Sequence, residues 1–250
     1  MFHLSLYDAS IANGTILLQV AAVADPVLAP SGSSFLVNSQ CPNIMRISAV
    51  GTNLTRVQLT SGSLGAFAPF DINPVNVGTI MGDPARGLFL EDQPLVLAIN
   101  ETLNAFGVQS NAGAQRITVA VTFCDGPVRK VLGRPFSLHW TAAATLVANA
   151  FTSFAPVFDN GLPSGTFAIV GSRCISAGAL YHRIIPRGGS PLRPGTFACQ
   201  AQSGLAVKDD RDGGLGEFLR FTNTTPPQIE IFSRSADTTE EGYFDLMKVA

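Results

Sequence analysis

The sequence is poor in charged residues. Asp, Glu, Lys and Arg make up 14% of the 250 residues, against about a quarter in ordinary soluble domains. Lysine occurs only at Lys130, Lys208 and Lys248, and the net charge is −2. Proteins that package nucleic acid neutralise phosphates with many Lys and Arg residues. The composition therefore argues against that class and against direct, sequence-specific nucleic acid binding.

Histidine and cysteine are also scarce, which limits metal and redox chemistry. No CxxC pair is present, and no two of His3, His139 and His182 stand at metal-ligand spacing. Cys124 and Cys174 stand at the ends of apolar runs, where we expect small core residues.

Motifs of the common enzyme classes are missing as well. The chain has no GxSxG, no GxGxxG and no P-loop. A Ser–His–Asp triad assembled from distant positions stays open. His139, beside Trp140 in an apolar stretch, is expected to be partly buried and hydrogen-bonded. We assign no catalytic, cofactor-binding or metal-binding residue, and expect no cofactor and no enzyme activity.

Long apolar runs are absent too. No stretch reaches the roughly 18 apolar residues of a membrane-spanning helix. The N-terminus has neither the basic nor the apolar segment of a signal peptide. We therefore expect folding in a reducing cytoplasm.

What the sequence does contain is typical of many short strands. Its 24 Gly and 16 Pro are scattered, as turns between strands require, and 46% of the residues are hydrophobic. There are 17 Phe residues, which fill the space between sheets without needing a hydrogen-bond partner. Asn13-Gly14 is a strong hairpin signal. The sequence predicts an all-β fold.

The stretch 93–123 predicts a closing pair of strands. Residues 93–102 read as one strand that runs into a polar turn, 109–115 as a loop, and 116–123 as a β-branched second strand. We expect Leu95, Leu97 and Ile99 to share one buried face.

A similar closing pair ends the chain, within residues 217–225 and 242–249. Asn100 then corresponds to Asn223 and Phe123 to Val249, so the offset is about half of the 250 residues. Lys248 is expected at the barrel rim. Two shorter matches have nearly the same offset: 47–49 with 175–177, and Arg56-Val57 with Arg183-Ile184.

These matches predict two similar β units in tandem. We place the first at residues 1–126, a linker at 127–135 and the second at 136–250. Residues 141–150 have the best helix propensity in the chain but fit a strand of small residues equally well.

Two groups of charged residues remain as candidate sites. Asp209, Asp210 and Asp212 could bind a hard cation such as calcium through oxygen ligands, although the spacing is not that of an EF-hand and a solvated turn is the alternative. We expect the cluster Arg183, Arg187 and Arg193 to be a solvated loop.

Two similar halves of many short strands are compatible with two tandem jelly-roll β-barrels, a double jelly roll with few short helices. On its two closing units, 94–123 and 218–249, its length and its low charge, the chain resembles the double jelly-roll major capsid proteins of small icosahedral, membrane-containing bacterial viruses. The resemblance implies a homotrimeric, pseudo-hexameric capsomer in a virion assembled in the host cytoplasm. Its partners would be other copies, minor capsid proteins and an internal lipid membrane.

Two other classes stay open. A sugar- or surface-binding β-sandwich, such as a lectin or adhesin, would expose aromatic side chains in its loops, whereas Trp140 is the single Trp. A jelly-roll enzyme of the cupin type would need a cluster of metal-binding histidines. Immunoglobulin-like pairs would need the Cys…Trp…Cys pattern, which is missing.

Overall fold

The protein is all-β. The computed structural model describes residues 1–11, 17–19, 34–51, 54–64, 70–72, 75–76, 88–90, 92–109, 115–127, 131–133, 136–176, 178–188, 192–196, 199–200, 216–233, 235–238 and 240–250. These residues form strands and connections and no helix. Accordingly, none of them lies in a helix that could cross a membrane.

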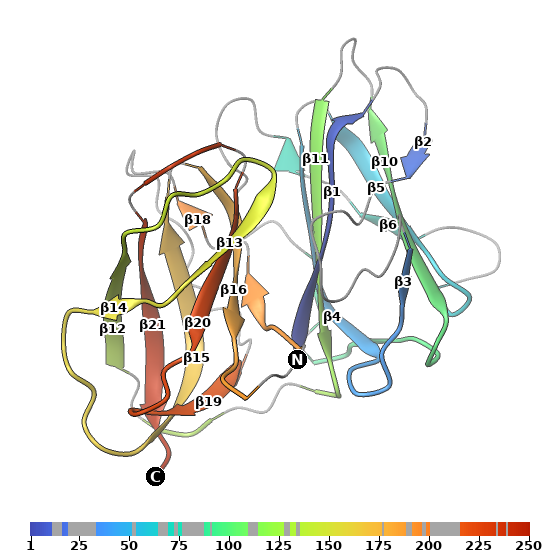
Figure 1. The fold of residues 1–250 in the computed structure, drawn as a ribbon. Helices are drawn as coiled ribbons and strands as arrows, with labels where there is room; N and C mark the ends of the chain where they lie inside the picture. The colour runs from blue at the N-terminus through green and yellow to red at the C-terminus, as the bar shows by residue number, and fades with distance from the viewer. Residues whose placement is uncertain are drawn as a thin grey trace. The chain divides into compact units, whose positions relative to one another are not determined.

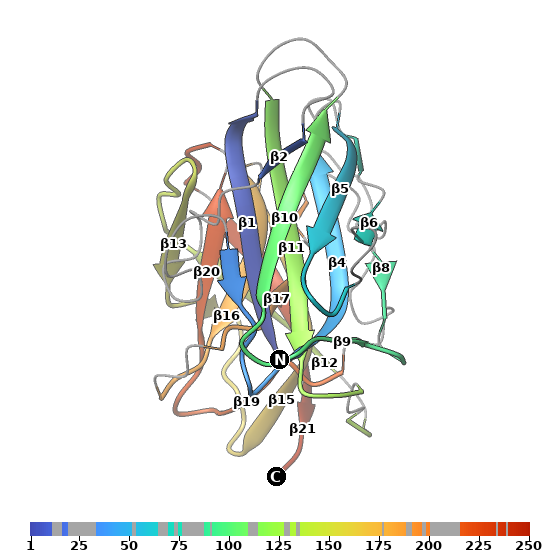
Figure 2. The same ribbon diagram turned by 90° about the vertical axis from the view of Figure 1, so that its right-hand side faces the viewer.

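The chain divides into two compact units. The N-terminal unit contains Leu4–Pro127, and the C-terminal unit contains Val128–Ala250 together with Met1–His3. Each unit consists of two facing sheets (Figures 1 and 2).

The N-terminal unit is built from two mainly antiparallel sheets. In the first, the order is β1-β11-β4, and β7, β8 and β9 all pair with β4; in the second, the order is β2-β10-β5-β6, and β3 also pairs with β10. The strands of the first sheet are β1 (Phe2–Ile11), β4 (Asn43–Gly51), β7 (Val75–Asn76), β8 (Leu88–Phe89), β9 (Leu95–Val96) and β11 (Gln115–Cys124). Those of the second are β2 (Leu17–Gln19), β3 (Ser34–Leu36), β5 (Leu54–Thr60), β6 (Phe70–Ile72) and β10 (Thr102–Gln109).

The C-terminal unit repeats this arrangement. One sheet has the order β14-β12-β21-β15-β18, with β19 also on β15, and the other has the order β13-β20-β16-β17. The strands of the first sheet are β12 (Phe136–Ala142), β14 (Val157–Phe158), β15 (Thr166–Ile175), β18 (Cys199–Gln200), β19 (Leu219–Thr222) and β21 (Glu240–Lys248). Those of the second are β13 (Ala150–Phe154), β16 (Ala179–Ile185), β17 (Gly195–Thr196) and β20 (Gln228–Ser233).

Strand order identifies both units as jelly rolls. When the principal strands of each unit are lettered B to I along the chain, one sheet reads BIDG and the other CHEF in both units. This is the two-sheet order of a jelly roll. The fold is therefore two tandem jelly rolls with the same strand order, as the internal duplication predicts.

Alternation along the strands builds the core between the sheets. In β12, Leu138, Trp140 and Ala142 are buried while their neighbours are more exposed, as the two-residue period of a strand requires. Val119, Val121 and Phe123 in β11 are buried, and so are Phe244 and Leu246 in β21. Cys124 and Cys174 are buried core residues, which confirms their assignment.

The first closing strand was wrongly placed. Of residues 93–102, only Leu95–Val96 and Thr102, the first residue of β10, lie in strands, and the chain turns between them at Asn100, which has a φ of 64°. Asn is one of the few residues that tolerate this left-handed conformation. The strand that pairs with β5 is instead β10, Thr102–Gln109. The turn leaves Ile99 exposed while Leu97 is buried, so the predicted shared face is wrong.

The helix alternative for residues 141–150 is also wrong. Thr141 and Ala142 end β12, where they pair with β21, and Ala150 begins β13, where it pairs with β20. Pairing on both sheets outweighs the weak helix propensity of the small residues between them.

The short internal matches fall in corresponding strands, β4 with β15 and β5 with β16, but differ in their place along the strand or in burial. Ile47 lies in the middle of β4, whereas Ile175 is the last residue of β15. Arg56 is exposed and Arg183 is buried. Lys248 is exposed at the end of β21, as expected. The hairpin at Asn13-Gly14 lies outside the described residues.

Candidate functional site

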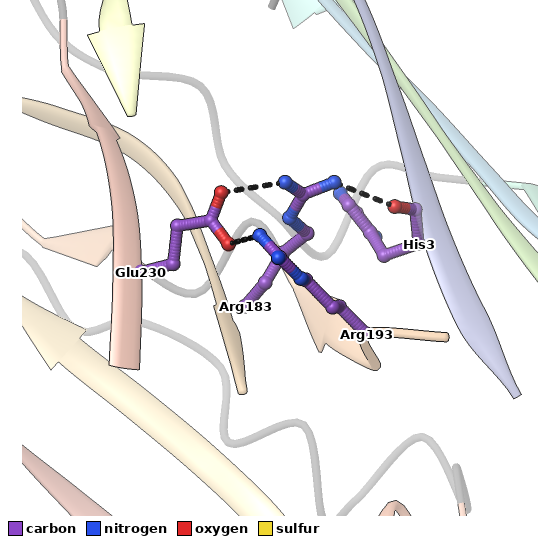
Figure 3. Close-up of polar contacts among 4 residues, drawn as sticks. All are labelled: His3, Arg183, Arg193 and Glu230. Carbon is purple, nitrogen blue, oxygen red and sulfur yellow. Dashed lines mark hydrogen bonds and ion pairs between the residues drawn. The ribbon is translucent and has the colours of Figure 1, made fainter. Parts of the chain in front are cut away.

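A buried arginine–glutamate cluster lies in the C-terminal unit (Figure 3). Arg183 lies in β16 and Glu230 opposite it in β20. Arg183 Nη2 donates to Glu230 Oε1 at 2.7 Å, and Arg193 Nη1 donates to the other oxygen, Glu230 Oε2. The side chains of Arg183 and Glu230 are 0% and 1% exposed, and that of Arg193 is 19% exposed. The carboxylate thus has a guanidinium on each oxygen.

The first residues of the chain complete this cluster. Arg183 Nη1 donates to the backbone carbonyl of His3 at 3.3 Å, and the His3 backbone N–H donates to the carbonyl of Arg193 at 2.8 Å. The His3 ring also lies 5.5 Å from that of Tyr181. Residues Met1–His3 are therefore an integral part of the C-terminal unit.

Local packing fixes the Arg183 side chain. Its guanidinium lies over the Phe151 ring, 4.0 Å from the centroid, a cation–π arrangement. Strand β17 approaches β16 closely at Gly195. A Cβ added there would lie 2.4 Å from the His182 carbonyl oxygen and 2.7 Å from Arg183 Cγ. Glycine is therefore required at this position.

The expected solvated loop of Arg183, Arg187 and Arg193 is wrong for two of its three members. Only Arg187 is exposed, and it donates to the Pro226 carbonyl at 2.9 Å. Sequence reasoning also missed Glu230. Its signal was present, because Glu230 stands between Ile229 and Ile231, and a charge inside an apolar strand needs a partner.

A serine–histidine pair lies deeper in the same unit. Ser172 Oγ and His182 Nε2 are 2.6 Å apart, and both residues are fully buried. Burial lowers the pKa of His182 to about 3, so the imidazole is neutral at pH 7. A substrate cannot reach either atom, and the pair serves to join β15 to β16.

His139 lies on the partly exposed face of the β12–β21 pair, the face opposite to that of the buried Leu138 and Trp140. Its Nδ1 is 2.5 Å from Asp159 Oδ2 and its Nε2 is 3.4 Å from Glu241 Oε2. Its ring packs 4.8 Å from that of Tyr243, over which Arg173 also lies. The expectation that His139 is partly buried and hydrogen-bonded is confirmed.

One buried carboxylate has a different environment. Glu240, the first residue of β21, is 1% exposed, and among the described residues neither carboxylate oxygen has a partner at hydrogen-bond geometry, although the Ser176 hydroxyl lies close enough to act on its pKa. Burial, followed by the charge of Asp237, raises its pKa to about 7, and the nearby Ser176 hydroxyl acts in the opposite direction. An unpaired buried carboxylate is unusual and calls for an explanation.

The predicted aspartate site cannot be compared with the structure. Asp209, Asp210 and Asp212 lie outside the described residues. Within the described ranges, no three His, Cys, Asp or Glu side chains come together in a way that could hold a metal ion.

Comparison with known proteins supplies no argument for the fold or the function. No family model matches the sequence, and no curated protein matches it. Among solved structures, the chain is similar to the major capsid protein P2 of bacteriophage PM2, with 10% identity over 99% of this chain and 98% of that one, at a TM-score of 0.24. The assignment of the fold rests on the strand order described above.

Proposed function

We propose that this chain is the major capsid protein of an icosahedral, membrane-containing bacterial virus. In this proposal it is a structural protein of the virion, assembled in the host cytoplasm, with no catalytic site. The observation that supports it is the presence of two jelly rolls with one strand order in a single chain. We assign the first jelly roll to residues 1–126, the linker to 127–135 and the second to 136–250.

Symmetry explains why such a chain suits a shell. A homotrimer of two-barrel chains contains six similar barrels, so a threefold molecule presents a nearly sixfold outline. A particle with six nearly equivalent sides can pack in a hexagonal lattice, although it contains three chains and not six. The capsomer would thus be trimeric and pseudo-hexameric.

Composition supports permanent lateral contacts. Large obligate interfaces are more apolar than the rest of a protein surface, and an unpaired charge buried in one is costly. The 14% content of charged residues fits that demand. The proposed partners are other copies of the chain, minor capsid proteins and an internal lipid membrane, with no direct contact with nucleic acid.

Sedimentation of the purified chain at micromolar concentration tests this proposal. We expect a species with three times the 26.3 kDa chain mass, stable across a salt series because apolar contacts are not screened. A monomer that persists across salt and concentration contradicts the proposal. If that monomer binds glycans, the sugar-binding β-sandwich takes its place.

A further inference from the structure

Three connections meet at one end of the C-terminal jelly roll, around Glu240. The described residues of these connections are 143–149 after β12, Ser176 and Gly178 after β15, and 235–238 before β21. Because β12 and β15 both run antiparallel to β21, their last residues lie beside its first. Glu240 itself pairs with Ala142, at the end of β12.

Hydrogen bonds join all three connections to one another. The Leu146 N–H donates to the Asp237 carbonyl at 2.8 Å, and Ser176 Oγ donates to Asp237 Oδ2 at 3.4 Å. Ser233 Oγ donates to the Gly178 carbonyl at 2.9 Å. This network closes the end of the barrel, and the Glu240 carboxylate is buried beside it, near Ser176 and Asp237.

The charge on Glu240 opposes this closed arrangement. Asp237 is the titratable group of the described chain that acts on Glu240, and it has the same sign. The adjacent Glu241 contacts His139 instead. A buried carboxylate with few hydrogen-bond donors around it and a second carboxylate nearby is more stable when its charge is neutralised.

We propose that a proton on Glu240 holds these three connections together, and that loss of the proton releases this end of the C-terminal jelly roll. The device is separate from the capsid proposal, because it operates within one unit of one chain. It would make the closed end of the barrel responsive to alkaline conditions.

The direction of the pH dependence follows from the linkage between proton binding and folding. The pKa of Glu240 in the folded protein, about 7, lies above its ordinary value of 4.5, so the folded state binds the proton more tightly than the unfolded state. The closed form is favoured at low pH, and that preference is lost as the pH rises through about 7.

Amide hydrogen exchange of the full chain, read by mass spectrometry at about pH 6 and about pH 8.5, tests the proposal. After correction for intrinsic exchange, we expect residues 143–149, 178–179 and 235–238 to exchange about tenfold faster at the higher pH, because pH 6 lies about one unit below the folded pKa of Glu240 and each unit corresponds to a factor of ten. The variant Glu240→Gln keeps the shape of the side chain without its charge, and should stay protected at both values. The control Glu241→Gln should behave as the wild type.

Three results would overturn the proposal. Exchange that does not change with pH in the wild type is one. Equal acceleration in the wild type and in Glu240→Gln is another, because the pH effect would then come from elsewhere. Protection restored at high pH by calcium alone would show that a cation, rather than a proton, neutralises the carboxylate.

Discussion

Individual charged residues carry much of the specificity of the C-terminal unit. Arg183 and Arg193 each pair with one oxygen of Glu230, whereas among the described residues the oxygens of Glu240 have no partner at hydrogen-bond geometry. The first arrangement supplies a cation for each carboxylate oxygen. The second ties stability to protonation, because burial raises the pKa of Glu240 to about 7. The surroundings of each buried charge thus decide whether it acts as a fixed contact or as a proton-dependent one.

Removing Arg183 should destabilise the C-terminal unit strongly. In Arg183→Met, Glu230 loses one of its two partners while it remains buried, and we expect the free energy of unfolding to fall by about 3–5 kcal/mol. Urea unfolding followed by Trp140 fluorescence measures this unit selectively, because Trp140 is the single Trp and is fully buried there.

A matched control separates burial from charge. Arg220 pairs with Glu217 at 2.7 Å, but its side chain is 58% exposed. Surface ion pairs contribute little, so Arg220→Met should leave the unfolding midpoint where it is. A loss of less than about 1 kcal/mol for Arg183→Met would show that the buried pair is not a major contributor.

At the scale of elements, β21 organises the C-terminal unit. It pairs with β12 on one side and β15 on the other, in the position of strand I. The strands approach so closely at Gly242 that an added Cβ would lie 2.1 Å from the Arg173 carbonyl oxygen and 2.4 Å from the Trp140 ring. The backbone oxygen cannot move away without breaking the pairing.

Gly242→Ala should therefore weaken the sheet. Overpacking typically costs about 1–3 kcal/mol and more when backbone must shift, and the same fluorescence-detected unfolding measures it. Gly161 of the same unit has no atom within 4 Å of the corresponding Cβ position, so Gly161→Ala serves as the control. Equal effects of the two substitutions would contradict the close approach at Gly242.

Strands with strong alternation could be predicted from the sequence, whereas turns within apolar stretches could not. The β-branched run of β11 was found because most of its residues, among them Ile117, Val119 and Val121, favour a strand. The preceding strand was displaced because Leu95 to Ile99 look like a strand, although Asn100 adopts a left-handed turn there. That turn depends on hydrogen bonds of Asn100 and Glu101 to Val37, which is far away in the sequence.

The candidate sites were also hard to predict, because they depend on contacts between residues that are far apart in the sequence. Arg183 and Glu230 are far apart in the chain, and only the pairing of β16 with β20 brings them together. His3 joins them from the N-terminus. No local spacing encodes such a cluster, so the sequence alone placed these arginines in a solvated loop.

For the whole molecule, the repeated jelly roll is the feature from which the proposed function follows. The two units have the same strand order, although the few sequence matches between them are short and Ile47 and Ile175 differ in their place along the strand. Strand order is maintained by the pattern of buried residues, which many sequences satisfy. This explains how two halves can share an architecture with little sequence similarity between them.

Electron microscopy of the purified oligomer tests the central claim most directly. Class averages should show a threefold particle with six similar lobes, one for each jelly roll of three chains. The same particle should recur as the repeating unit of a closed shell in native material. A particle with two lobes, or a ring whose symmetry is not threefold, would contradict the account.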